Sequence, residues 1–423
     1  MDGRCARTAQ RPDRSAVHGR RFLRPCQVGL KRRRSVLVDL HAHYPMHLAQ
    51  MTKIGARGWI TKLVRACTLK FLNNHDNFPA ADDPAVTIPH LKEGNAGVIL
   101  SVLYAPFDEM DLTKEYAAPP AIDYFNDIRQ QMLAVEHEIE HDFPNEAAVA
   151  RNHAELDRAL AEGKVALIHA IEGGFQLGEC PDHIQANVQK LAGWGVGYVT
   201  VAHLFFRQVA TNAPAIPFLP DWVYNWWFPQ PPEGLTPLGI AAIRAMVDNH
   251  ILIDLTHMRK DSIEATLNLL DQIDPAREVP VVATHAAYRF GTLKYNLVDD
   301  HILRIAARKG VIGLIACDHF MTDGIRGRTT SLEQSLEVLQ RHIDKIAQLT
   351  GSHENIAIGT DLDGFIKPTL NGLEFPSGFN AVRTYLEKQY SQTVVDQIFS
   401  NNALRLLSYW RGDVKEQAVA GGQ

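Results

Sequence analysis

Eight short apolar runs, separated for the most part by amphipathic stretches, constrain the fold of this sequence more than any other feature. The runs are Val36–Asp39, Ala96–Tyr104, Val165–Ile171, Gly197–Ala202, Ile251–Leu255, Pro280–Thr284, Val311–Ala316 and Ile356–Gly359. They are rich in β-branched residues and continuously apolar, which is typical of parallel strands buried on both faces. Eight strands in alternation with helices predict an α/β fold, a closed (β/α)8 TIM barrel rather than an open sheet.

Helix signals lie between the runs. Thr236–Asn249 opens with Thr-Pro, which places a capping residue ahead of a proline at the first helical position. Asp299–Lys309 and Ser331–Leu349 are similar, and Phe379–Leu407 is expected to form helices beneath or beside the barrel. We therefore expect a barrel domain with C-terminal helices over residues 35–423, because such barrels run from ~250 residues to past ~400 with insertions.

Two connections are longer than the others, after strands two and four. Residues 105–163 include an acidic helical stretch at Asp127–Asp142, and residues 204–235 carry an aromatic cluster within 222–228. A loop that follows the fourth strand must cross the mouth of the barrel. The aromatic cluster is therefore interpreted either as structural packing or as the wall of a pocket.

The charge is unevenly distributed. Ten Arg and one Lys against two Asp give residues 1–34 a net charge of +9, so the rest of the chain carries −14 of the total of −5. A body that acidic would repel phosphates, which argues against a nucleic-acid partner. The basic segment is interpreted as a disordered tail, with a targeting peptide and a nucleic-acid-binding arm as alternatives.

Two kinds of segment that are not found in the sequence bear on the cellular location of the protein. No apolar run reaches the ~18 residues that a membrane span requires, and nothing resembles a secretory signal. The five cysteines are scattered and form no C-x-x-C pair, as suits a reducing compartment; they are Cys5, Cys26, Cys67, Cys180 and Cys317. We expect a soluble cytoplasmic protein with no membrane partner.

Polar residues follow six of the eight runs. They are His41 and His43 after the first run, Glu172 after the third, His203 after the fourth, His257 after the fifth, His285 after the sixth and Asp361 after the eighth. The active site of a (β/α)8 barrel lies at the carboxyl ends of its strands, so these side chains are expected to converge. A single histidine at a strand end is more often an ordinary loop residue, but such residues after six strands favour a shared site.

These residue types indicate a metal centre. Alternate residues of a strand project to the same side, so His41 and His43 can grip one ion together. Imidazole and carboxylate ligands suit zinc or a similar first-row metal. Glu172 can bridge two ions, and two divalent metals ~3.5–4 Å apart can generate a hydroxide at neutral pH and polarise a scissile carbonyl.

Seven motifs, in order, resemble the membrane (renal) dipeptidase family of zinc peptidases, whose members have an amidohydrolase-like barrel. The resemblance covers roughly residues 36–410. Its pieces are IEGG at Ile171–Gly174, GLTPLG at Gly234–Gly239, DLTHM at Asp254–Met258, THAA at Thr284–Ala287, YNLVDD at Tyr295–Asp300, IGTDLDG at Ile358–Gly364 and NNALRLL at Asn401–Leu407. The ordered set is specific, whereas any single piece is weak.

The resemblance implies a role for each residue of the predicted site. One metal is held by His41, His43 and Glu172, and the second by Glu172, His257 and His285. His203 matches a histidine that contacts the substrate oxyanion, and Asp361 matches the aspartate that handles the proton of the bridging water. The resemblance also implies a homodimer.

Two positions depart from the family pattern. His43 stands where the family has Asp, and Tyr295, immediately before Asn296, stands where the family has an Arg that clamps the substrate carboxylate. Either Arg289 or Lys294 in the same loop replaces that clamp, or the natural substrate lacks a C-terminal carboxylate. Tyr295, Arg289 and Asn296 are the predicted substrate-binding residues.

Three functions follow from these observations. The leading hypothesis is a binuclear metal-dependent hydrolase that cleaves a small peptide or amide bond, with a dipeptide-like small molecule as substrate. The second is an amidohydrolase that acts on N-acyl compounds or lactones. The third is a metal-free binding protein without catalytic activity, against which the six strand-end positions argue.

Overall fold

The computed structural model describes residues 35–48, 58–64, 84–110, 115–216, 219–364, 366 and 368–412. The predictions made for residues 1–34 lie outside this set, as do Cys5, Cys26 and Cys67.

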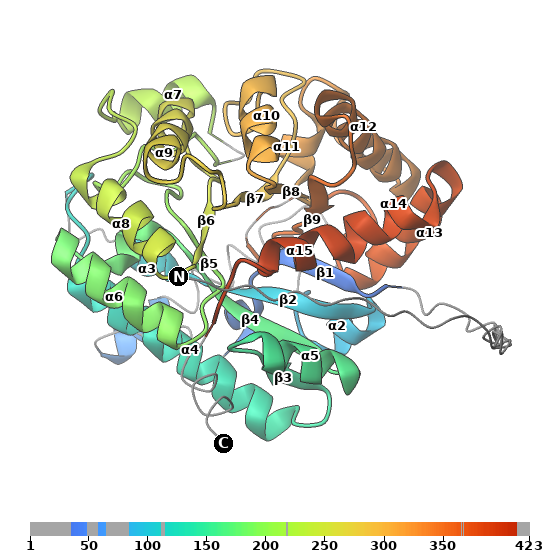
Figure 1. Ribbon diagram of the computed structural model, residues 1–423, viewed down its shortest axis with the longest axis horizontal. Coiled ribbons are helices and arrows are strands. Elements are labelled where there is room, and N and C mark those ends of the chain that lie inside the picture. The colour runs from blue at the N-terminus through green and yellow to red at the C-terminus, as the bar shows by residue number, and fades with distance from the viewer. Residues whose placement is uncertain are drawn as a thin grey trace, which may run out of the picture. The chain divides into compact units, whose positions relative to one another are not determined.

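Eight parallel strands close into a barrel that is surrounded by helices (Figure 1). The strands are β1 (Leu37–Ala42), β2 (Ala96–Leu103), β4 (Val165–Glu172), β5 (Tyr198–Thr200), β6 (Leu252–Asp254), β7 (Val281–Ala286), β8 (Val311–Leu314) and β9 (Ile356–Ile358). Each pairs with its neighbours, and the β2–β4 and β1–β9 pairings complete the ring. The (β/α)8 fold and all eight predicted strands are confirmed.

A ninth strand, β3 (Ala147–Val149), was not predicted. It pairs in parallel with the first half of β4, from Val165 to Leu167, whereas β5 pairs only with the last two residues of β4. The short β3 therefore covers the edge of β4 that β5 leaves open. Exposed edges of this kind invite unwanted pairing, which explains the presence of the extra strand.

The helices alternate with the strands as expected. They are α2 (Ile88–Glu93), α3 (Pro106–Glu109), α4 (Ile122–Asp142), α5 (His153–Ala161), α6 (Pro181–Gly193), α7 (Asp221–Trp227), α8 (Pro237–Asp248), α9 (Lys260–Ile273), α10 (Asp299–Ala307), α11 (Asp318–Thr322), α12 (Leu332–Thr350), α13 (Phe379–Gln389), α14 (Gln392–Asp396) and α15 (Asn402–Leu407). Thr236 caps α8 through its hydroxyl, with Pro237 at the first position, as predicted. Within the described residues, no helix is both long and apolar enough to span a bilayer.

The interior of the barrel is packed too tightly for side chains at some positions. At Gly313 on β8 and Gly359 after β9, a Cβ atom would overlap the carbonyl oxygen of Thr284. Buried side-chain hydrogen bonds also join neighbouring strands. Asp254 accepts from the hydroxyls of Thr200 and Thr284 at 2.6 and 2.7 Å. These contacts fix the carboxyl ends of the strands, where the site lies.

Candidate active site

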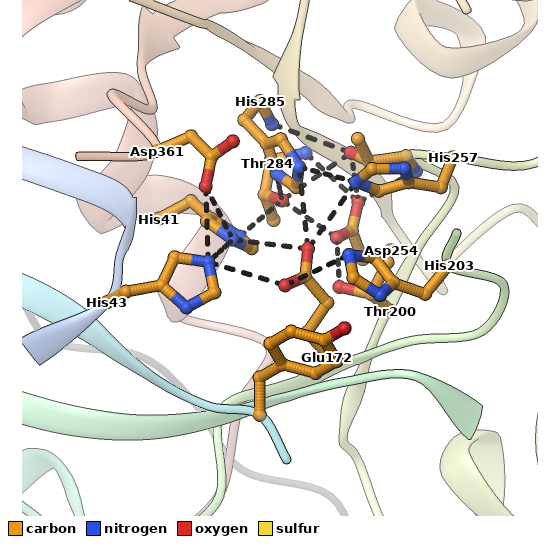
Figure 2. Close-up of polar contacts among 12 residues, drawn as sticks. His41, His43, Glu172, Thr200, His203, Asp254, His257, Thr284, His285 and Asp361 are labelled. Atoms are coloured by element: carbon orange, nitrogen blue, oxygen red, sulfur yellow. Dashed lines mark hydrogen bonds and ion pairs between the residues drawn. The ribbon is translucent and has the colours of Figure 1, made fainter. Parts of the chain in front are cut away.

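The seven residues predicted for the metal site and its chemistry meet at the carboxyl ends of the barrel strands (Figure 2). They are His41 on β1, His43 directly after it, Glu172 at the end of β4, His203 after β5, His257 after β6, His285 on β7 and Asp361 after β9. All seven side chains are buried. The structure therefore brings together every predicted metal ligand and both predicted catalytic residues.

Glu172 lies at the centre of the group. Its Oε1 is 3.3 Å from His41 Nε2 and 3.5 Å from the Nε2 atoms of both His257 and His285. Its Oε2 is 3.3 Å from His43 Nε2. Oε1 therefore faces histidines from both predicted metal sites, and Oε2 faces His43 and, at 3.3 Å, His203 Nε2.

Asp361 completes the side of the site formed by β1. Its Oδ1 is 3.1 Å from His43 Nε2 and 3.6 Å from His41 Nε2. The backbone N–H of Asp361 donates to the carbonyl of His41 at 2.8 Å, which ties the loop after β9 to β1. A Cβ atom at Gly364 would overlap Asp361 Oδ1, so a larger residue there would displace that carboxylate.

A hydroxyl behind the site fixes which ring nitrogen of His285 faces Glu172. Thr284 donates its single proton to Asp254 at 2.7 Å, and its Oγ1 lies 2.9 Å from His285 Nδ1, from which it must therefore accept. His285 Nε2 then points a lone pair at Glu172, as a metal-bound imidazole with an outer hydrogen bond does. His41 Nδ1 lies between two hydroxyls, 2.7 Å from Tyr198 and 3.1 Å from Thr284.

This donor set fits a cation. Glu172 Oε1 is buried and has no hydrogen-bond partner, although several ring nitrogens surround it. Lone pairs that converge on an unpaired carboxylate oxygen repel one another unless a positive charge lies between them. Ligand atoms within 4.8 Å of one another occur in the sets His41–His43–Glu172 and Glu172–His203–His257.

The electrostatics also favour a positive charge at this point. Burial alone would lower the pKa of His43, but its hydrogen bonds to Asp361 and Glu172 outweigh burial and raise that pKa to about 10. Burial opposes ionisation of Glu172, yet the surrounding imidazoles hold its pKa well below the ordinary value. In the absence of a metal ion, a proton on His43 therefore supplies the positive charge that a metal would otherwise provide.

Two of the site residues have left-handed backbone conformations that non-glycine residues rarely adopt. The φ angles are 65° at His257 and 58° at Asp361. Each such residue costs of the order of 1–3 kcal/mol and persists only where the surrounding structure holds it. Both turns follow directly after short strands and direct their side chains toward Glu172.

Sequence reasoning missed one residue of this site, Glu109 at the end of α3. Its side chain is 0 % exposed, and its Oε2 accepts from His203 Nδ1 at 2.6 Å and from the Tyr104 hydroxyl at 2.8 Å. The only signal in the sequence was that no polar residue had been proposed after β2, and Glu109 lies several residues beyond the end of that strand, in α3.

A cavity of about 840 Å³, its open mouth included, lies over this group of residues, and His43, Glu172, His203, His257 and Asp361 line it. Its further walls are predominantly apolar and include Tyr104, Pro106, Met110, Leu204, Phe205, Ala215, Ile216, Tyr295, Phe320 and Ile366. No lysine or arginine occurs among the described residues that line it.

Of the three predicted substrate-binding residues, the structure brings only Tyr295 to the cavity. Its hydroxyl donates to the His285 carbonyl at 2.6 Å, and its ring stacks on Phe320. Asn296 is buried and donates to the Phe320 carbonyl at 2.8 Å. Arg289 donates to the Lys294 carbonyl at 2.6 Å and does not line the cavity.

The aromatic cluster of residues 222–228 supports the cavity from outside. Trp222 and Trp226 on α7 are 73 % and 74 % exposed. Tyr224 is buried, and both Tyr224 and Phe228 pack against Phe205, which lines the cavity. The cluster therefore backs one cavity wall but supplies none of its described lining.

A closed (β/α)8 barrel with imidazoles and carboxylates converging at its strand ends defines a metal-dependent hydrolase of the amidohydrolase-like class. The family model "Membrane dipeptidase (Peptidase family M19)" matches residues 31–417. The chain therefore belongs to the membrane dipeptidase family, and it is a metal-dependent, dipeptidase-like hydrolase. The family resemblance and the enzyme class expected from the sequence are confirmed.

Characterised relatives and solved structures are distant in sequence. Dipeptidase verJ of Clonostachys rogersoniana is 23% identical over 324 residues, covering 76% of this chain and 74% of that protein. The structure of dipeptidase AC matches with a TM-score of 0.66 at 20% identity, covering 90% of this chain and 100% of that one. A metallopeptidase from Rhodobacter sphaeroides, liganded with a phosphinate mimic of the dipeptide L-Ala-D-Ala, matches with a TM-score of 0.65 at 19% identity, covering 89% and 100%.

Proposed function

We propose that this hydrolase cleaves the amide or peptide bond of a small substrate that carries no free C-terminal carboxylate, such as an N-acyl compound or a capped amide. The observation that supports this choice is the apolar cavity, whose described lining contains no lysine or arginine. A buried carboxylate needs a paired cation, and arginine is preferred because its planar fork binds both oxygens. Tyr295 cannot substitute for that cation, because it donates its proton to a main-chain carbonyl.

Two divalent cations, zinc by the chemistry of the ligands, belong to the proposal. His41, His43 and Glu172 would hold one, and Glu172, His257 and His285 the other. When bound, such a pair polarises a scissile carbonyl and makes water a nucleophile at neutral pH. The unpaired Oε1 of Glu172, surrounded by ring nitrogens, supports the bridging role.

The remaining roles fall to two side chains that line the cavity. Asp361 has a carboxylate beside His43 and can accept the proton of the attacking water and deliver it to the leaving nitrogen. His203 presents Nε2 to the cavity, 3.3 Å from Glu172 Oε2, where a proton on that nitrogen would be donated to the oxyanion. The apolar walls would hold the substrate's side chains and exclude water.

Kinetics on leucyl-phenylalanine and its C-terminal amide test the substrate class. We expect kcat/KM to be higher for the amide by at least about tenfold, since a charge-assisted hydrogen bond contributes ~1.5–3 kcal/mol and the described lining offers the free acid no lysine or arginine. Phe290→Ala, a neighbouring exposed side chain, serves as the control for Arg289→Ala. A preference for the free acid that Arg289→Ala abolishes and Phe290→Ala preserves would restore a plain dipeptidase.

Elemental analysis after metal loading tests the metal centre. We expect two zinc ions per chain in the wild type and fewer in Glu172→Ala, because that variant removes the shared ligand. A content near one that Glu172→Ala leaves unchanged would contradict the two-metal proposal.

A cytoplasmic homodimer also belongs to the proposal. The two cysteines in the described part of the chain, Cys180 and Cys317, are free thiols, as a reducing compartment requires. The dimer rests on the family resemblance, and sedimentation of the full chain measures it. A monomer at micromolar concentration would contradict it.

A further inference from the structure

The proposed roles leave one buried acidic side chain beside the site unused. Three donors converge on the Glu109 carboxylate: His203 Nδ1–H at 2.6 Å, the Tyr104 hydroxyl at 2.8 Å and the backbone N–H of Phe205 at 2.8 Å. Two of them, from His203 and Tyr104, share Oε2, while Oε1 takes the third. A carboxylate offers about four lone-pair sites, so three donors occupy most of its accepting capacity.

This arrangement determines which nitrogen His203 presents to the cavity. Because Glu109 accepts from Nδ1, that nitrogen carries a proton, and donation from Nε2 to an oxyanion therefore requires the imidazolium form, which the adjacent Glu109 carboxylate stabilises. The ring is then oriented with Nε2 directed at the site, 3.3 Å from Glu172 Oε2. The Tyr104 ring meets the His203 ring edge to face with centroids 4.6 Å apart, which restricts rotation of the imidazole.

Two side chains, Arg207 and Gln131, hold the backbone around Glu109 in place. The guanidinium of Arg207 donates to the Glu109 carbonyl through Nε at 3.1 Å and also through Nη2. Gln131 on α4 exchanges two hydrogen bonds with the backbone of Tyr104, at 3.1 and 3.0 Å, and so fixes the end of β2. The long connection after β2 thus supplies a rigid support for a residue that follows β5.

We propose that Glu109 is a positioning residue that holds the His203 ring with Nε2 toward the reacting carbonyl oxygen. The inference rests on the role proposed for His203 and assigns the support of that role to a residue outside the metal ligands. It predicts that Glu109 affects the rate mainly through His203, although it also accepts from Tyr104 and Phe205 in the cavity wall. Loss of such an outer partner typically reduces activity or metal affinity ~10–100-fold.

A double-mutant cycle tests this coupling, with leucyl-phenylalaninamide as the substrate. Glu109→Gln keeps the size of the side chain but replaces one oxygen acceptor by an NH2 group. We expect Glu109→Gln to lower kcat by ~10–100-fold with KM and metal content nearly unchanged. In the His203→Ala background, the same change should lower kcat less than about threefold, because the ring that it positions is gone.

Asp363→Asn is the matched control. Asp363 is a half-buried acidic residue in the loop after β9, and it accepts from the backbone N–H groups of Ala85 and Val86 and not from His203. Its effect on kcat should be the same in both backgrounds. If Glu109→Gln folds poorly, Glu109→Asp keeps the charge but retracts the carboxylate from Nδ1, and the same cycle applies.

The double-mutant cycle distinguishes the positioning role of Glu109 from the role proposed for His203. If His203→Ala lowers kcat and Glu109→Gln lowers it by an equal factor in both backgrounds, the positioning role is wrong while the proposed function stands. Loss of metal in Glu109→Gln would also overturn it, since Glu109 would then support a metal ligand. If His203→Ala leaves kcat unchanged, the role proposed for His203 fails and the inference fails with it.

Discussion

Replacing Tyr295 by phenylalanine distinguishes a cavity wall from a substrate donor. The substitution removes only the hydroxyl, which donates to the His285 carbonyl at 2.6 Å, and keeps the ring stacked on Phe320 with centroids 4.1 Å apart. A buried carbonyl that loses its donor costs about 1–3 kcal/mol. We expect the free energy of unfolding of Tyr295→Phe to fall by that amount.

Turnover should change much less than stability. Because the proton of Tyr295 is already donated to the main chain, the variant withdraws no donor from the substrate. We expect kcat and KM for leucyl-phenylalaninamide to stay within about threefold of wild type, a difference of about 0.7 kcal/mol. Urea unfolding of the metal-loaded proteins gives the stability difference, and steady-state kinetics give the rate.

Tyr385→Phe provides the control for this comparison. Tyr385 donates to the side chain of Gln340 at 2.6 Å and does not line the cavity, so its loss should affect stability alone. A tenfold rise in KM for Tyr295→Phe, with its unfolding free energy unchanged, would refute the reasoning. The hydroxyl would then serve the substrate, as the sequence first indicated.

Three further predictions concern the metal-binding face. Asp361→Asn should lower kcat by ~10²–10⁴-fold while elemental analysis finds wild-type metal content, because the amide cannot accept a proton; near-normal kcat would make Asp361 purely structural. In the metal-free protein, the pKa of His43 is raised, so its contribution to the free energy of unfolding is complete below pH 6.5 and is lost as pH rises through about 10. Urea unfolding from pH 6 to 10 measures this loss. His43→Gln should make the free energy of unfolding less dependent on pH. Gly364→Ala should reduce metal content and turnover because the added Cβ displaces Asp361, and unaltered zinc binding and kcat would contradict the overlap.

The strands and their polar ends could be predicted from sequence because both follow local patterns. Each barrel strand is buried along its whole length and therefore reads as a continuous apolar run. The position of β3 follows no such pattern: it has only three residues, and only its first is fully buried. Its existence depends on the open edge of β4, which is a tertiary feature.

The contrast between local patterns and tertiary features also explains which site residues could be predicted from the sequence. His41, Glu172 and Asp361 end strands or follow them directly, so chain position alone brings them together. Glu109 lies several residues beyond β2, in a four-residue helix, and only the folded loop aims it at His203. The hydrogen bond from the Tyr295 hydroxyl to the His285 carbonyl likewise depends on the folded structure and could not be predicted from the sequence.

The left-handed backbone at His257 and Asp361 implies a conflict between the stability of the fold and the proposed activity. Glycine would relieve the backbone strain at both positions, about 1–3 kcal/mol each, and would at the same time delete a proposed metal ligand or the proposed proton carrier. Selection for stability alone would therefore not protect these two residues. Laboratory evolution toward a more stable variant should be screened for activity in every round.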